Sequence, residues 1–147
     1  MTALLELNAE QLLEELPQLL NESQISETIS AYFAALNAEA YADIVALFAA
    51  DGMLFPPFED AVVGPKAISH YLQAEAVGMR AIPATYQLIR TNNSTNEQRV
   101  LVRGSVQLPL FNVNVAWDFC LTVSGKIKSV RVNLLASLEE LVKFRSQ

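Results

Sequence analysis

The feature that most constrains the fold is a change of hydrophobic period near Pro83. Before this residue, apolar side chains recur about every four positions, as they do along one face of a helix. After it, apolar and polar residues alternate, as they do along a half-buried strand. A run of helices followed by a run of strands predicts an α+β fold with an antiparallel sheet, and disfavours a doubly wound α/β fold.

The helical part contains three predicted helices, over residues 21–39, 41–52 and 65–78. Pro65 suits the first turn of the third helix, and Gly52 and Gly78 suit the ends of the second and third. Further upstream, leucines fall on a helical stripe broken by Pro17. We therefore expect residues 1–22 to form an amphipathic extension that packs on a domain spanning residues 23–147, or on a second copy of it.

The strand-forming part contains four alternating segments, at residues 84–91, 98–111, 113–123 and 126–137. They are rich in β-branched residues, and the polar stretches between them are typical of turns. Residues 138–147 predict a short helix or a tail. A curved antiparallel sheet wrapped around about three helices would form a cone with an interior cavity.

Two inward-facing residues carry polar groups, Tyr32 on the first helix and Trp117 on the third strand segment. Trp117 shares its strand face with Val113, Val115 and Phe119, because alternate residues point to the same side. A buried phenol and a buried indole N–H each need an acceptor. Each could reach a backbone carbonyl, or both could point at one spot and bind the carbonyl oxygen of a ligand.

Composition excludes several classes of function. Hydrophobic residues make up 52% of the 147 residues and charged residues 18%, which suffices for a core and an apolar cavity in one domain. The net charge of −6 and the absence of a basic run argue against nucleic-acid binding. No apolar run reaches the roughly 18–20 residues that span a bilayer, and the N-terminus does not resemble a signal peptide. The single cysteine excludes a Cys-based zinc site and fits a reducing compartment. Because the chain also shows neither a membrane-spanning run nor a signal peptide, we expect a cytoplasmic protein without an integral membrane segment.

Several sequence blocks resemble one branch of the nuclear-transport-factor-two-like proteins, the superfamily that includes ketosteroid isomerase. The blocks are "PPF…VG" at 56–64, "VQLPLF" at 106–111, "NVAW" at 114–117 and "LLAS" at 134–137. In this order they are similar to the C-terminal domain of the orange carotenoid protein and its stand-alone homologues. The resemblance runs from about residue 25 to residue 142.

This resemblance implies non-covalent binding of a ketocarotenoid of the echinenone or canthaxanthin type, in photoprotection of a cyanobacterium-like cell. The ring keto oxygen would accept hydrogen bonds from Tyr32 and Trp117. The apolar tunnel would include Leu36, Leu108, Pro109, Leu110, Val132 and Leu134. The protruding end of the pigment would be covered by a second copy or by a helical carotenoid-protein domain, and Glu75 stands where the family places an interdomain carboxylate. The sequence departs from the family at Leu110, where tryptophan is common, and at Asn133, where aspartate is common.

Two other functions stay open. An isomerase-like or cyclase-like enzyme would use Tyr32 as the oxyanion donor, but it also needs acids, and their positions align with Pro56 and Val115, which cannot move a proton. We therefore predict no enzymatic activity and no metal site, and we expect the other acids and His70 to face solvent. The second alternative is a dimeric interaction module that uses the outer sheet face. Cys120 lies on that face, either packed or in a disulfide between two chains.

Overall fold

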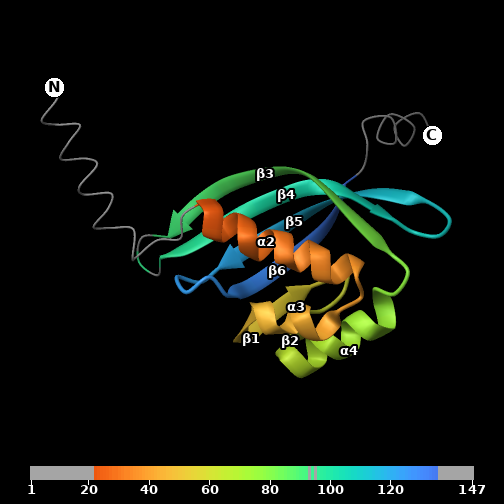
Figure 1. Ribbon diagram of the computed structural model, residues 1–147, viewed down its shortest axis with the longest axis horizontal. Coiled ribbons are helices and arrows are strands. Elements are labelled where there is room, and N and C mark those ends of the chain that lie inside the picture. The colour runs from red at the N-terminus through yellow and green to blue at the C-terminus, as the bar shows by residue number, and fades with distance from the viewer. Residues whose placement is uncertain (1–21, 93, 95, 136–147) are drawn as a thin grey trace, which may run out of the picture.

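The computed structural model describes residues 22–92, 94 and 96–135 of the chain. These residues form three helices and a curved, unclosed sheet of six strands, which confirms the α+β prediction (Figure 1). The extension expected over residues 1–22 lies outside the described residues except for Glu22, and so does the segment 138–147. Among the helices described, none is both long enough and apolar enough to cross a membrane.

The described chain runs as two helices, two strands and a third helix, and then continues as strands alone. The helices are α2 (Glu22–Asn37), α3 (Tyr41–Leu47) and α4 (Pro65–Glu75). The strands are β1 (Phe48–Phe55), β2 (Val62–Val63), β3 (Arg80–Asn92), β4 (Glu97–Gln107), β5 (Asn112–Leu121) and β6 (Ile127–Leu135). Their order across the sheet is β2-β1-β6-β5-β4-β3.

The sheet is antiparallel except at one pair. Strands β3 to β6 follow one another as antiparallel neighbours, whereas β1 runs parallel to β6, with Leu54 opposite Val130. The four predicted strand segments therefore form an antiparallel sheet as expected, and the parallel pair involves β1, which lies outside those segments. Nearly the whole domain separates β1 from β6 along the chain, so no hairpin forces the two strands to run in opposite directions.

The second predicted helix, 41–52, ends earlier than its sequence pattern indicated. Helix α3 stops at Leu47, and Phe48 adopts an extended backbone with φ −82° and ψ 149°. Phe48 lies opposite Ile127 in the sheet, so pairing with a distant strand replaces the local helical hydrogen bonds. Gly52 accordingly lies within β1 rather than at a helix end.

Strands β3 and β4 approach each other closely at Gly104. Helix α4 ends at Glu75, and Gly78 follows in a turn with φ 84°. Strand β3 starts at Arg80, four residues before the predicted start, and its register shifts just after Pro83. A Cβ atom at Gly104 would lie 2.1 Å from the Ile82 carbonyl oxygen, so only glycine permits this approach.

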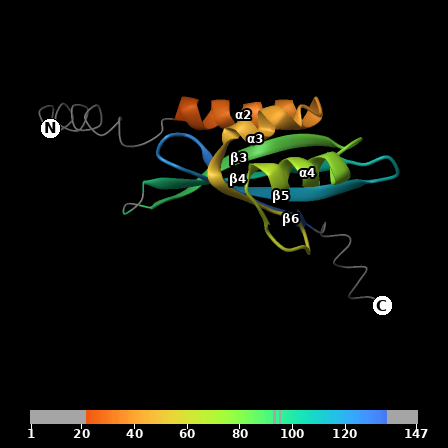
Figure 2. The same cartoon turned by 90° about the horizontal axis from the view of Figure 1, so that it is seen from below.

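Helix α2 lies across the inner face of the sheet (Figures 1 and 2). A cluster of aromatic rings packs between the helix and the sheet. Phe33 meets Trp117 edge to face with ring centroids 4.8 Å apart, and Tyr32 meets Phe119 in the same way at 5.2 Å. Phe119 has no exposed surface. These contacts hold Tyr32 and Trp117 in fixed orientations, because rings packed at right angles leave little freedom to turn.

Candidate functional site

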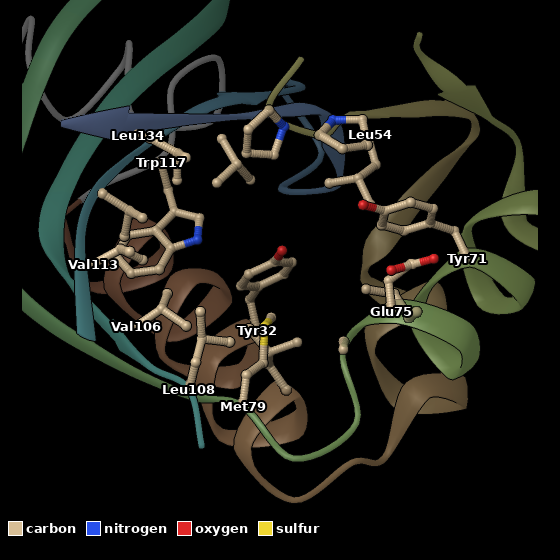
Figure 3. A pocket seen from close by; sticks show the side chains of 17 residues that line it. Tyr32, Leu54, Tyr71, Glu75, Met79, Val106, Leu108, Val113, Trp117 and Leu134 are labelled. Atoms are coloured by element: carbon tan, nitrogen blue, oxygen red, sulfur yellow. The ribbon is translucent and has the colours of Figure 1, made fainter. Parts of the chain in front are cut away.

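A cavity of about 180 Å³ lies beside this aromatic cluster, between the sheet and helices α2 and α4 (Figure 3). Strands β4, β5 and β6 supply one side, and the Pro56–Pro57 turn after β1 supplies another. The wall is mainly apolar, and it is formed by Tyr32, Leu36, Leu54, Pro56, Pro57, Tyr71, Leu72, Glu75, Ala76, Met79, Val106, Leu108, Val113, Val115, Trp117, Val132 and Leu134.

Two hydrogen-bond donors point into this cavity, the Tyr32 hydroxyl and the Trp117 indole N–H (Figure 3). Each residue is 2% exposed. Within the part of the chain that the structure describes, neither group has a hydrogen-bond partner, in contrast to the expectation that each could reach a backbone carbonyl. The Tyr41 hydroxyl also lacks a partner there, but it is sealed in the core. Among the described residues, the cavity therefore presents two donors that are not paired with any acceptor of the chain.

Burial fixes the protonation state of Tyr32. Removal of its hydroxyl from water raises the pKa of Tyr32 well above its ordinary value of 10.0. The cause is desolvation, which penalises the charged phenolate. Tyr32 therefore remains a neutral O–H donor at physiological pH, and it can donate to a carbonyl oxygen but cannot act as an anionic base.

The structure brings most of the predicted ligand-binding residues together. Tyr32, Trp117 and four of the predicted tunnel residues line the cavity, namely Leu36, Leu108, Val132 and Leu134. Pro109 and Leu110 do not line it. They occupy the turn between β4 and β5, which the Leu108 N–H closes by donating to the Phe111 carbonyl over 2.9 Å, and the turn leaves Leu110 92% exposed.

The two positions that were aligned with isomerase acids belong to the cavity wall. Pro56 follows the end of β1, and Val115 is buried on β5. Neither side chain carries an ionisable group, so neither can transfer a proton at this site. Asp51, Glu59, Asp60 and His70 are exposed, as expected. No three His, Cys, Asp or Glu side chains are grouped as a metal would require among the residues described.

Sequence analysis did not place three residues of α4 and the turn after it in the wall, namely Tyr71, Glu75 and Met79. The Tyr71 hydroxyl donates to Glu59 Oε2 over 2.9 Å. Desolvation is the larger cause and this hydrogen bond the next, and both raise the pKa of Tyr71 above its ordinary value. The i, i+4 spacing of Tyr71 and Glu75 could have indicated a shared helix face, but not that this face borders a cavity.

The outer sheet face is polar and paired. Arg99 forms an ion pair with Asp118, and Lys128 Nζ lies 2.7 Å from Glu97 Oε1. Cys120 lies half-buried between them, with its Sγ 3.5 Å from Glu97 Oε2. Desolvation and this hydrogen bond raise the pKa of Cys120 to about 11, which suppresses the thiolate needed for disulfide exchange. Ala116 shares this strand face with Asp118 and Cys120 and is buried, with 5% exposure.

Comparison of the sequence and the structure with known proteins identifies the family of this chain. The profile of the SnoaL-like domain matches residues 17–111. The orange carotenoid-binding protein of Synechocystis sp. is 32% identical over 127 residues, which are 84% of this chain and 39% of that protein. The solved structure of the Anabaena (Nostoc) sp. orange carotenoid protein binding canthaxanthin superposes with a TM-score of 0.72 and 33% identity, over 86% of this chain and 40% of that one.

The match has two limits. This chain spans about two fifths of the length of these carotenoid-binding relatives. The fold also recurs in a ketosteroid isomerase-like protein from Erwinia carotovora atroseptica, with a TM-score of 0.61 and 18% identity over 80% of this chain and 100% of that one. Identity this low shows only that the two folds are alike.

Proposed function

Because the chain belongs to the SnoaL-like domain family, we propose that it binds one end of a ketocarotenoid non-covalently and performs no chemistry on it. It would act as a carrier, donor or quencher of the pigment. The observation that carries this proposal is the pair of unpartnered donors, Tyr32 and Trp117, directed into an apolar cavity. The similarity to the canthaxanthin-binding Anabaena protein supports the choice of ligand.

The chemistry of the wall fits a conjugated ketone. A ring carbonyl would accept hydrogen bonds from both donors, and these bonds would satisfy groups whose burial otherwise costs about 1–3 kcal/mol each. The apolar ring and polyene would contribute most of the affinity, at about 25 cal/mol per Å² removed from water. Two donors on the carbonyl would polarise the conjugated system and move its absorption to longer wavelength.

The size of the cavity supports a ligand that is only partly enclosed. Pockets that bury a whole drug-sized ligand have volumes of roughly 300–1,000 Å³, whereas this one has about 180 Å³. One end ring would enter, next to Leu36, Leu108, Val132 and Leu134, and the polyene would leave past the turn with Pro109 and Leu110.

We propose that a second copy of the chain covers the protruding end. Phe58 next to Pro57 is 94% exposed, and Leu110 close to Leu108 is 92% exposed, so the mouth is bordered by apolar side chains. Exposed apolar surface of this kind marks interaction sites. A helical carotenoid-protein domain would be the alternative cover and the recipient of the pigment.

The compartment we propose is the cytoplasm. The chain contains one cysteine in 147 residues, and intracellular proteins seldom rely on disulfides. The raised pKa of Cys120, about 11, keeps it a thiol at neutral pH. The outer face would then play no covalent part in the assembly of two chains.

The test is to produce the protein in cells that make echinenone or canthaxanthin and to record its absorption spectrum and its size in solution. A coloured, red-shifted dimer is expected. The double variant Tyr32→Phe, Trp117→Phe should fold and lose most of the shift, whereas Tyr86→Phe, on β3 outside the cavity, should retain it. A colourless protein with the pigment left in the membranes would overturn the proposal.

A second candidate function rests on Glu75, since its carboxylate is at the cavity with the Tyr32 donor. An isomerase-like or cyclase-like enzyme would use Glu75 as the base that the Pro56 and Val115 positions cannot supply. Deuterium exchange at the carbon next to the carbonyl of small cyclic ketones would test this. Exchange that disappears in Glu75→Gln would favour an enzyme over a carrier.

A further inference from the structure

Four polar side chains contribute to the cavity wall, and three of them have an assigned use. Tyr32 and Trp117 are the donors proposed for the ligand carbonyl, and the Tyr71 hydroxyl donates to Glu59. Glu75 is the fourth, and its carboxylate can only accept hydrogen bonds when ionised. The wall therefore offers one acceptor in addition to its two free donors.

The local structure gives no reason for an acid at this position. Glu75 is the last residue of α4, at the helix end whose partial charge is negative, where a carboxylate is unfavourable. Among the described residues it makes no hydrogen bond and no ion pair. Its charge instead disfavours ionisation of Tyr71, one turn earlier, and so contributes to the raised pKa of that residue.

The position of Glu75 relative to the donors restricts what it can contact. Figure 3 shows Glu75 beside Tyr71, across the cavity from Trp117, with the Tyr32 hydroxyl directed into the space between them. A ring whose carbonyl is bound by Tyr32 and Trp117 would therefore turn the ring position next to that carbonyl toward Glu75. Glu75 is exposed to solvent on its outer side. A hydrocarbon edge placed against its cavity side would remove part of the water around the carboxylate without replacing the lost hydrogen bonds, which is costly for a charged group.

We infer that Glu75 is a specificity-determining residue that accepts a hydrogen bond from a hydroxyl group on the buried ring. The inference rests on the proposed carotenoid-binding function. It adds that, among ketocarotenoids, the site prefers those whose buried ring carries both a carbonyl and a hydroxyl. A hydroxyl donating to a carboxylate forms a short, charge-assisted bond, about twice as strong as a neutral one. Selection would arise because rings without the hydroxyl leave the carboxylate covered and unpaired.

The experiment is a competition between two pigments, astaxanthin, which has a hydroxyl beside each ring carbonyl, and canthaxanthin, which has the carbonyls alone. The purified 147-residue chain is loaded with an equal mixture of the two pigments, and the retained ratio is measured by extraction and chromatography. We expect an enrichment of astaxanthin of about tenfold, reduced in Glu75→Gln and abolished or reversed in Glu75→Leu. Glu27→Leu, which removes an exposed carboxylate of α2 away from the cavity, should leave the ratio unchanged.

The outcomes separate the two proposals. Equal retention of both pigments, or the same enrichment in Glu75→Leu as in the unmodified chain, would overturn the role of Glu75 and leave carotenoid binding intact. If neither pigment were retained, the proposed function itself would fail. A Glu75→Leu variant with an unchanged ratio but altered assembly would assign the carboxylate to a protein partner instead, which also overturns the inference.

Discussion

The inner face of the sheet has two ends built from the same strands, one packed solid and one hollow. At the packed end, Val102, Phe119 and Val130 have no exposed surface. At the hollow end, Val106, Val115 and Val132 on the same three strands line the cavity. Both rows are apolar and both follow the period of two, so the strands themselves do not determine which end is filled.

The difference comes from what faces the strands. Rings of α2 fill the packed end, where Phe33 and Phe119 lie with centroids 5.9 Å apart. The hollow end faces α4 and the Pro56–Pro57 turn, where the wall includes the small residue Ala76. An apolar row becomes core where the facing helix places its rings directly against the strands. It becomes a binding site where the side chains of the facing elements, here including Tyr71 and Ala76, leave a space in front of the strands.

The largest expected effect separates the two ends by stability. Phe119→Ala should lower the free energy of unfolding by about 3–5 kcal/mol, because it removes a fully buried ring and leaves a void. Leu108→Ala, in the wall of the existing cavity and half-buried, should cost only about 1 kcal/mol. Urea denaturation of both variants measures the difference. Equal losses would mean that the hollow end supports the fold as much as the packed end does.

The next effect comes from adding volume at equivalent positions. Val102→Phe should cost about 1–3 kcal/mol of stability, because the packed end has no space for a ring. Val106→Phe, four residues along the same strand, should change stability by less than about 1 kcal/mol and weaken ligand binding about tenfold by occupying the cavity. Denaturation and pigment retention, measured on both variants, test the contrast. A Val106→Phe chain that binds pigment normally would show that the cavity is not the site.

The helices, the strands and the inward direction of Tyr32 and Trp117 followed from periodicity, because each depends on a pattern local to its own element. The start of β1 did not, since "ALFAADG" is a short apolar run that suits helix and strand alike, and Ile127, some 80 residues away, decides between them. The place of Glu75 in the wall depends on how α4 packs. The exposure of Leu110 depends on the turn after β4, and no alternation of residues encodes either.

A pH effect is expected at the hollow end, where Tyr32 is a neutral phenol with a raised pKa. A group whose pKa is higher in the folded than in the unfolded state loses its contribution as the pH rises past the unfolded value, here about 10. The unmodified chain should therefore lose about 1.4 kcal/mol at pH 11 through this residue alone. Tyr32→Phe should be at least as stable as the parent at pH 7, because it removes a buried hydroxyl without a partner among the described residues. It should also lose less stability at pH 11, as urea midpoints at the two pH values would reveal. Parallel losses in both chains would contradict the assignment.

The smallest effect belongs to the outer face, behind the packed end, where Arg99 pairs with Asp118. The Arg99 side chain is 46% exposed, and exposed ion pairs contribute about 0.2–1 kcal/mol because water and salt screen them. Arg99→Gln should therefore lower the unfolding free energy by less than about 1 kcal/mol, with the loss shrinking further in 0.5 M salt, and should leave pigment retention unchanged. Lys128→Gln, at the neighbouring pair with Glu97, is the matched control and should behave alike. A large loss of stability or of pigment in either variant would mean that the outer face helps to hold the cavity open, and the contrast between the two ends would then no longer rest on the inner face alone.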